Sequence, residues 1–437
     1  MDNFEIRIDD LDMHGYGIAH KDGKTIFIDN ALPSEIVKAK LIKQQKNIIF
    51  AKNIDLLKKS EYRKIPLCPY FFDCGGCDIQ HLCYEKALEY KKQQIALSFK
   101  KICGINLGDF EIVKSPQEYF YRNKISMKIC DYNGEKVLCY YKKNSHDKVK
   151  IESCKIANQK FDEVIKFVNL FLKSCSLPTY NEKEKTGTLK HLVARIIDNK
   201  LLLTFVLNEN KQLENIESLY QNLLKHFEKV GINKNINKSD KQILSDNFEN
   251  IIGDNVIEFE NLNLKQQITN ASFLQVNTFV ANEIYEYVCS LLNGNIVNCY
   301  AGAGLLSGII ANKNEQSEVF GIEINKQATM LAEILKEKNK ILNLTNLCGD
   351  SGEVLENLNL KNFNLVVDPP KSGLAENMIK NILKFLPQKI VYISCDKISL
   401  AKNYNSIKQF YKIDEIKAFD MFPQTVNVET VLTLSRK

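Results

Sequence analysis

The chain lacks any long apolar run. Nowhere do about 18 uncharged apolar residues follow one another, which is the length that a helix needs to cross a bilayer. The N-terminus, Met1-Asp2-Asn3-Phe4-Glu5, also lacks the hydrophobic stretch of a secretory signal. Both absences disfavour a membrane protein and a secreted one, so we expect a cytoplasmic location without membrane contact.

Cysteine is plentiful, but the pattern typical of secreted proteins is missing. The chain has 13 cysteines, an odd number, and no secretory segment precedes them. In a reducing compartment thiols serve as metal ligands or nucleophiles rather than as disulfides. We therefore expect the cysteines to mark chemistry.

Positive charge is concentrated near the N-terminus. Residues 1–160 carry 28 Lys and Arg against 21 Asp and Glu, whereas residues 161–437 carry 31 against 32. One basic cluster consists of Lys38, Lys40, Lys43, Lys46, Lys52, Lys58, Lys59, Arg63 and Lys64. Such a cluster can bind RNA phosphates and release their counterions, or it can be a solvated surface. Charge alone leaves both interpretations open.

Residues 1–62 have the pattern of a small β-barrel. Short strands are predicted at residues 4–8, 17–20, 25–28 and 36–42. Turn residues such as Asp22-Gly23 separate them. Barrels of this size are a common fold for binding nucleic acid.

Residues 63–265 predict a mixed α+β region. A lysine-rich helix is expected at 84–101, and Asn133-Gly134 predicts a hairpin between strands 124–130 and 137–141. Further strands are expected at 187–207 and 251–260, and a helix with a variable loop at 211–246.

From about residue 278, helices and strands alternate. Strands are predicted at 296–299, 319–322, 365–367 and 390–393, with helices between them. This alternation is typical of a doubly wound parallel sheet, which binds ligands at the carboxyl ends of its strands. We expect an α/β chain of three domains, at 1–62, 63–265 and 266–437, without an internal repeat.

Cys68, Cys74 and Cys77 have the spacing of a metal site. Two glycines before Cys77 let the backbone fold tightly enough to bring the three sulfurs together. A fourth ligand is needed, and either Cys83 nearby or Cys154 far downstream could supply it. Zinc sites usually use two close pairs, whereas iron–sulfur clusters often use three clustered cysteines and a remote one. Spacing alone leaves the choice open.

Unusual residues follow the predicted parallel strands. Tyr300-Ala301-Gly302-Ala303-Gly304 follows the first strand and lets the backbone approach a ligand closely. Glu323 ends the next strand, where a carboxylate suits ribose hydroxyls. A nucleoside cofactor is expected, either NAD or S-adenosylmethionine. A structural turn with a surface glutamate is the alternative.

Reactive groups also follow two later strands, at the same edge of the predicted sheet. Asp368-Pro369-Pro370 forms a rigid corner that can hold a flat ring, although Lys371 replaces the aromatic residue that amino-methyltransferases use there. Cys395 follows the next strand and is placed to act as a nucleophile if a positive or dipolar environment lowers its pKa. A buried, inert thiol is the alternative.

Together these residues resemble the S-adenosylmethionine-dependent RNA uracil-C5 methyltransferases, the bacterial 23S rRNA and tRNA enzymes. The resemblance covers nearly the whole chain. It rests on Ile18-Ala19-His20, Ala31-Leu32-Pro33, the cysteine cluster with Gln80-His81, Tyr121-Arg122-Asn123-Lys124, Phe273-Leu274-Gln275-Val276-Asn277, Tyr300–Gly304, Asp368-Pro369-Pro370, Ser394-Cys395, Phe422-Pro423-Gln424-Thr425 and Glu429.

The resemblance implies a role for each site residue. Cys395 would add to C6 of uracil, and Glu429 would remove the C5 proton after methyl transfer. The residues implied to hold S-adenosylmethionine or orient the uracil are Gln275, Tyr300, Gly302, Gly304, Glu323 and Asp368. The barrel would be a TRAM domain, and Cys68, Cys74, Cys77 and Cys154 would hold a 4Fe–4S cluster, leaving Cys83 outside it.

The implied substrate is a single-stranded or loop uridine, because the base must leave its stack to reach the thiol. We expect 23S rRNA first, with tRNA as the alternative, and a monomeric enzyme. Three positions depart from the family pattern: Lys371 for Arg, Asp396-Lys397 for Asn-Pro, and Asn427 for His. The second raises the question of how the nucleophile packs locally.

Two other functions compete with this interpretation. One is an RNA-binding protein with a redox-sensing cluster and an inactive methyltransferase domain, which the presence of both Cys395 and Glu429 disfavours. The other is methylation of a base amino group at the Asp368 corner, which needs no cysteine.

Overall fold

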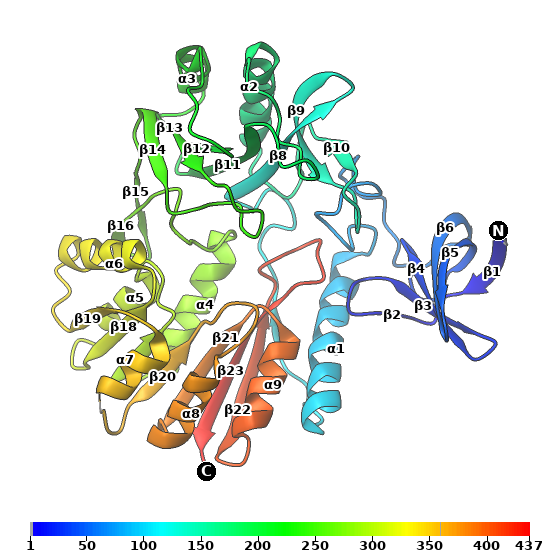
Figure 1. The fold of residues 1–437 in the computed structure, drawn as a ribbon. Helices are drawn as coiled ribbons and strands as arrows, with labels where there is room; N and C mark the ends of the chain where they lie inside the picture. Colours follow the sequence, from blue (N-terminus) through cyan, green and yellow to red (C-terminus); the bar gives the residue numbers. More distant parts are fainter. Residues whose placement is uncertain (1–2, 359) are drawn as a thin grey trace.

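The computed structural model describes residues 3–358 and 360–437, and its first sheet, blue in Figure 1, lies to one side of the rest. Its six strands have the order β1-β5-β6-β4-β3-β2. They are β1 (Asn3–Arg7), β2 (Asp10–Leu11), β3 (Gly17–Lys21), β4 (Lys24–Asp29), β5 (Ile36–Gln45) and β6 (Ile48–Lys58). Only Ile8 and Asp9 separate β1 from β2, which lie at opposite ends of this order, so the sheet curls into the expected barrel. Alternate residues such as Ile26 and Ile28 fill its core.

The second sheet has seven strands in the order β10-β9-β8-β11-β12-β13-β14. They are β8 (Lys124–Tyr132), β9 (Glu135–Tyr141), β10 (Lys148–Lys150), β11 (Leu189–Ile197), β12 (Lys200–Leu207), β13 (Lys229–Ile236) and β14 (Phe248–Gly253). Helices α2 (Phe161–Ser174) and α3 (Ile216–Leu224) cover one face, where Met127 and Phe205 join a single apolar core (Figure 1). Lys128 follows Met127 in β8 and therefore belongs to the opposite face.

The third sheet has eight strands in the order β19-β18-β17-β20-β21-β23-β22-β7. Its strands are β7 (Ile112–Val113), β17 (Ile296–Cys299), β18 (Val319–Glu323), β19 (Leu344–Cys348), β20 (Asn364–Val367), β21 (Lys389–Ser394), β22 (Tyr411–Phe419) and β23 (Glu429–Arg436). Its helices are α4 (Thr278–Ser290), α5 (Leu305–Lys313), α6 (Lys326–Lys338), α7 (Ser351–Leu358), α8 (Glu376–Phe385) and α9 (Lys397–Ile407). The strands from β19 to β21 are parallel, which confirms the predicted doubly wound fold. A hairpin of β15 (Ile257–Asn261) and β16 (Leu264–Ile268) precedes α4.

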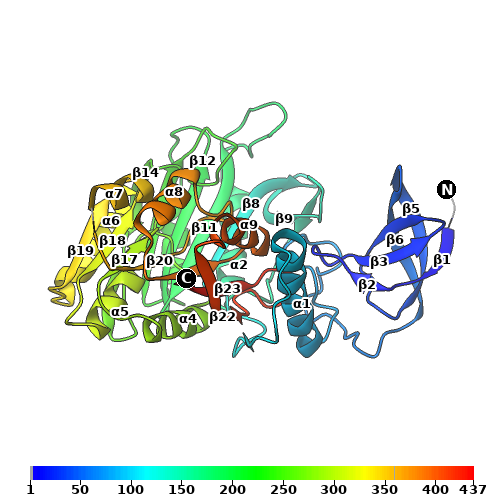
Figure 2. The ribbon, with the colours of Figure 1, turned by 90° about the horizontal axis from the view of Figure 1, so that it is seen from below.

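Helix α1 (Tyr84–Cys103) links these parts. It lies between the barrel and the C-terminal sheet in both views (Figures 1 and 2). Its Tyr90 packs with Leu11 of the barrel, whereas Phe99 lies in the core of the C-terminal sheet.

The predicted domain boundaries at residues 62 and 265 stay a prediction. No helix in the described ranges is long and apolar enough to cross a membrane.

The structure contains elements that the sequence patterns did not predict. Strand β6 includes the lysine-rich stretch near Lys52, and β13 lies inside the region expected to be helix and loop. Strand β13 pairs in parallel with β12, a long-range contact that its Asn- and Lys-rich sequence does not indicate.

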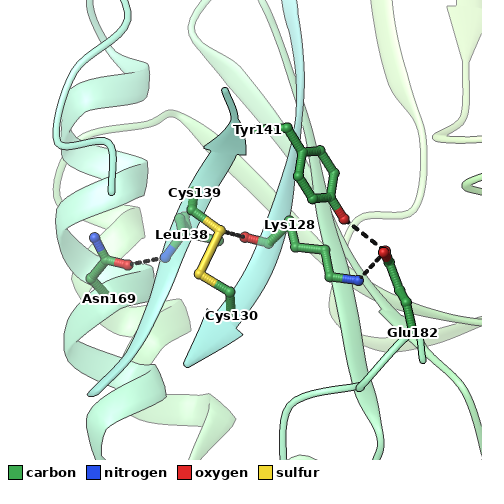
Figure 3. The surroundings of a disulfide bond; sticks show 7 residues. All are labelled: Lys128, Cys130, Leu138, Cys139, Tyr141, Asn169 and Glu182. Atoms are coloured by element: carbon green, nitrogen blue, oxygen red, sulfur yellow. Dashed lines mark hydrogen bonds and ion pairs between the residues drawn. A yellow bond between two sulfur atoms is a disulfide. The ribbon is translucent and has the colours of Figure 1, made fainter. Parts of the chain in front are cut away.

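One disulfide pairs two cysteines to which the sequence patterns assigned no role. Cys130 in β8 is bonded to Cys139 in β9, across the predicted Asn133-Gly134 hairpin (Figure 3). Both side chains are buried on neighbouring strands, which brings them together. Beside the disulfide, Lys128 and Tyr141 both donate to Glu182 Oε1, at 2.6 and 2.7 Å.

Candidate active site and cysteine pocket

The predicted cofactor residues gather at the carboxyl ends of neighbouring parallel strands. Tyr300 follows β17, Glu323 ends β18, and Asp368 follows β20. Strand β17 lies between the other two. The three residues therefore share the sheet edge at which doubly wound folds bind their ligands.

The turn after β17 is linked to β18. Tyr300 has a left-handed φ of 63°, and the Gly302 N–H donates to Glu323 Oε2 at 2.8 Å. A Cβ at Gly302 would meet nothing within 4 Å, so its backbone is open to a ligand. Gly304 differs, because a Cβ there would lie 2.5 Å from that of Ala332. Gly304 therefore allows α5 to pack closely on α6.

The predicted nucleophile lies at the start of a helix. Cys395 directly follows β21, and the next residue, Asp396, caps α9 by accepting from the N–H groups of Ile398 at 3.1 Å and Ser399 at 2.8 Å. Asp396 thus provides the helix cap, which shows how the chain packs at this departure from the family pattern.

The predicted base lies beside this cysteine on the neighbouring strand. In the antiparallel pairing of β21 with β23, Ser394 is opposite Thr430. The next residue pair is therefore Cys395 and Glu429. Glu429 is only 2% exposed.

Two carboxyl groups near Cys395 favour their protonated forms. Burial raises the pKa of Asp368 to about 7. Burial and the neighbouring Asp368 carboxylate raise the pKa of Glu429 well above its ordinary value. Because two close carboxylates repel each other when both are ionised, the pair retains a proton near neutral pH.

The condition for an activated Cys395, a positive or dipolar environment that lowers its pKa, is not met by the protein alone. Burial, together with the Glu429, Asp368 and Asp396 carboxylates, raises the pKa of Cys395 to about 11. The thiol is therefore protonated at neutral pH and needs a base to become a nucleophile.

Gln275 is held by the central sheet. Asn123, just before β8, donates from Nδ2 to the Gln275 carbonyl at 2.9 Å, and its N–H donates to the Val276 carbonyl at 2.8 Å. Asn277 then caps α4 by accepting from the Val280 N–H at 3.4 Å. Local sequence patterns indicate no role for Asn123, because its partners lie about 150 positions away in the chain.

Helix α1 holds the segment that leads to Glu429. Lys91 Nζ lies 2.5 Å from Asp420 Oδ1 and donates to the Phe422 carbonyl at 3.0 Å. The Tyr121 hydroxyl donates to the Pro423 carbonyl at 3.0 Å. Only one sequence feature pointed to the contact between Lys91 and Asp420, namely that Lys91 lies on the buried face of α1.

The four predicted cluster cysteines line one pocket. Cys68, Cys74, Cys77 and Cys154 surround a cavity of about 210 Å³, whereas Cys83, just before α1, does not line it. Burial raises the pKa of Cys74 to about 11, and the nearby Cys154 and Cys68 thiols contribute. Within residues 3–358 and 360–437, no three His, Cys, Asp or Glu side chains converge closely enough to hold a single metal ion.

A cleft of about 1360 Å³ opens between the barrel, the cysteine segment and the central sheet. The lysines that line it are Lys142, Lys143, Lys183, Lys185, Lys190 and Lys241, and they outnumber the lining carboxylates of Asp78, Glu182 and Asp240. In the part of the chain that the structure describes, none of the residues of the predicted N-terminal basic cluster lines this cleft. The barrel also contributes Tyr16 and Phe50, so the cleft combines positive charge with aromatic rings.

Comparisons with known proteins agree with this arrangement. The chain is 31% identical to an uncharacterized RNA methyltransferase of Clostridium acetobutylicum, covering 99% of this chain and 97% of that one, and 31% identical to one of Staphylococcus epidermidis with the same coverage. The fold matches the crystal structure of Pyrococcus abyssi tRNA (uracil-54, C5)-methyltransferase in complex with S-adenosyl-L-homocysteine, with a TM-score of 0.79, 25% identity, and coverage of 99% of this chain and 100% of that one. The family model for tRNA (uracil-5-)-methyltransferase matches residues 83–437. This chain is therefore an S-adenosylmethionine-dependent RNA methyltransferase and belongs to the tRNA (uracil-5-)-methyltransferase family.

Proposed function

We propose that the enzyme methylates C5 of a uridine through a covalent bond between Cys395 and C6 of the uracil. The strand register that puts Glu429 beside Cys395 carries this proposal. C5 of uracil is a weak nucleophile, and addition of a thiolate at C6 turns it into an enolate carbon. Methylation of an amino group would need no such pair.

Three side chains divide the proton transfers. When bound, S-adenosylmethionine supplies an electrophilic methyl group and a positive charge that favours both carboxylates of the Asp368–Glu429 pair in their ionised form. Asp368 accepts the thiol proton as Cys395 adds to C6. After methyl transfer, Glu429 accepts the C5 proton and the bond between Cys395 and C6 breaks. The released sulfur takes back the proton held by Asp368, and Glu429 releases the C5 proton to water.

The binding residues follow from the open edge of the sheet. Glu323 presents a carboxylate for the ribose of the cofactor, and the open backbone at Gly302 gives the cofactor close access. Gln275, Tyr300 and Asp368 complete the site. Gly304 contributes through the packing of α5 against α6 rather than by contact.

A 4Fe–4S cluster suits the cysteine pocket better than a single ion. Four thiols from two distant segments surround a cavity, and the Arg122 side chain lines it too, which favours a group of negative charge. Cys68, Cys74, Cys77 and Cys154 are the proposed ligands.

The substrate of the enzyme belongs to one of two classes of RNA, rRNA or tRNA. The family resemblance puts 23S rRNA first, and the similarity to the Pyrococcus abyssi tRNA enzyme supports tRNA as the second candidate. Mass mapping of 5-methyluridine in both RNAs from cells that lack the protein decides between them. The proposal predicts the loss of at least one modified uridine, which re-expression of the wild-type chain restores and the Cys395→Ala variant does not. Restoration by Cys395→Ala would refute the covalent route.

A further inference from the structure

The residues directly after Cys77 bind the turn that precedes Glu429. The N–H groups of Asp78 and Ile79 both donate to the Gln424 carbonyl, at 3.1 and 3.2 Å. In return, the Val426 N–H donates to Asp78 Oδ2 at 3.2 Å. Three hydrogen bonds therefore join two segments that lie almost 350 positions apart in the chain.

This turn has a backbone shape that needs support. Gln424 has φ of 71°, a left-handed conformation that is uncommon for a residue with a side chain. Such a conformation persists where the surroundings impose it. Here the two converging N–H groups hold the Gln424 carbonyl, and Glu118 Oε2 accepts from its side-chain amide at 3.1 Å.

The barrel touches the same junction. Gly15 has φ of 80°, and a Cβ at this position would lie 3.2 Å from both Ile79 Cγ2 and Val426 Cγ1. Asp78 and Val426 both line the large cleft. The barrel, the cysteine segment and the turn thus meet at the wall of the cleft.

We propose that Asp78 is a positioning residue for the final proton transfer. It fixes the turn at Gln424–Val426, and through this turn it sets the place of Glu429 beside Cys395. Glu429 follows Val426 by only three positions, so a shift of the turn moves the start of β23. This inference rests on the proposed role of Glu429 as the base.

The test is kinetic and uses the full-length enzyme with its natural cluster content. In Asp78→Ala, we expect kcat to fall about 10- to 100-fold, as a misplaced catalytic group does. The KM for RNA and the affinity for S-adenosylmethionine should change by less than about 3-fold, because Asp78 is an acidic residue in a cleft where the lysines are the expected RNA contacts. A methylated, covalent protein–RNA adduct should accumulate, since addition and methyl transfer precede the slowed step.

Two further variants isolate the hydrogen bond. Asp78→Asn keeps an oxygen that can accept from the Val426 N–H, so activity should return to within a few-fold of the wild type. Val426→Pro deletes the donor of the same bond without changing the cysteine segment, and should reproduce the Asp78→Ala defect. Asp73→Ala is the matched control, because this aspartate lies in the same segment with its side chain 65% exposed and should leave kcat unchanged.

The outcomes separate this inference from the proposed function. If Glu429→Gln accumulates the adduct but Asp78→Ala does not, the positioning role is wrong. Normal turnover in Asp78→Ala, or an equal loss of RNA and cofactor affinity, refutes it as well. If Glu429→Gln itself turns over normally, the assignment of the base fails instead.

Discussion

Lys91 and Asp420 form an ion pair in which each side chain is only 1% exposed. It joins α1, which lies between the barrel and the body of the protein, to the segment that leads into Glu429. Burial lowers the pKa of Lys91, while the Asp420 carboxylate counteracts that shift. Each charge therefore depends on the other in a place that water does not reach.

Removal of one partner should destabilise the fold strongly. In Lys91→Ala, Asp420 stays buried without its counter-charge, which costs about 3–5 kcal/mol of unfolding free energy. Urea unfolding monitored by circular dichroism measures the loss. The neighbouring Lys92→Ala is the control, because Lys92 pairs with Asp109, whose side chain is 95% exposed, and should cost less than about 1 kcal/mol. Similar unfolding midpoints for the two variants would contradict the prediction.

The proposed mechanism predicts that loss of the nucleophile and loss of the base stop the reaction at different steps. Cys395→Ala should form no adduct and transfer no methyl group. Glu429→Gln should add to C6 and accept the methyl group at C5, then stall with RNA bound because the C5 proton cannot leave. Denaturing gels with uridine-containing RNA and S-adenosylmethionine show the adduct as a slowly migrating band. Formation of 5-methyluridine by Cys395→Ala would exclude it as the nucleophile.

The pKa of Cys395 predicts the pH dependence of its alkylation. Since burial and nearby carboxylates raise this pKa to about 11, the thiolate fraction is small at pH 7 and grows as the pH rises toward 11. Iodoacetamide labelling followed by peptide mass spectrometry should therefore show slow reaction of Cys395 at pH 7 and faster reaction at pH 9. At pH values high enough for both carboxyl groups of the Asp368–Glu429 pair to be ionised, Glu429→Gln removes one negative charge and should speed labelling. The exposed Cys348 serves as the internal reference, and its rate should not respond to Glu429→Gln.

The cysteine pocket predicts iron and sulfide rather than zinc. Protein purified without oxygen should be brown and contain acid-labile sulfide. Cys154→Ser should lose the iron, whereas Cys83→Ser should retain it, because Cys83 does not line the pocket. Stoichiometric zinc without sulfide would disprove the cluster, and iron loss in Cys83→Ser alone would show that the wrong fourth ligand was chosen.

The position of the cleft predicts which lysines bind RNA. Lys183→Ala should weaken RNA binding and reduce the slope of log affinity against log salt by about 0.7 to 0.9 if it contacts one phosphate. Lys59→Ala on the barrel, whose side chain does not line the cleft, should have a smaller effect. Filter binding at several salt concentrations gives both slopes. A larger loss in Lys59→Ala would move the RNA path to the outer face of the barrel.

Much of the site could be predicted because its residues follow strands. Tyr300, Glu323 and Asp368 each stand directly after or at the end of a β-strand, so the period of the sequence and the fold class together place them at one edge. Local spacing indicated Cys68, Cys74 and Cys77 as candidate ligands, whereas Cys154 was implied only by the family resemblance, which covers nearly the whole chain.

Other features depend on contacts that local patterns do not encode. Asp78 looks like any acidic residue beside a cysteine until the turn at Gln424 is placed against it. The raised pKa of Cys395 follows from burial and from carboxylates that other segments bring close to it, which the sequence around Cys395 does not encode. Strand β13 was missed because its partner β12 stabilises it in parallel, against the weak strand preference of Asn and Lys.

The short strand β7 has a consequence for how the protein is built. It pairs with the edge of β22 although some 300 residues separate them, and α1 packs close by in the same core. A fragment that starts at residue 266 would lack this pairing with Ala418 and Phe419 and the part of its core that α1 supplies. We therefore expect such a fragment to be less stable than the same residues in the full chain. During synthesis, the segment that pairs with the end of β22 is made long before that strand.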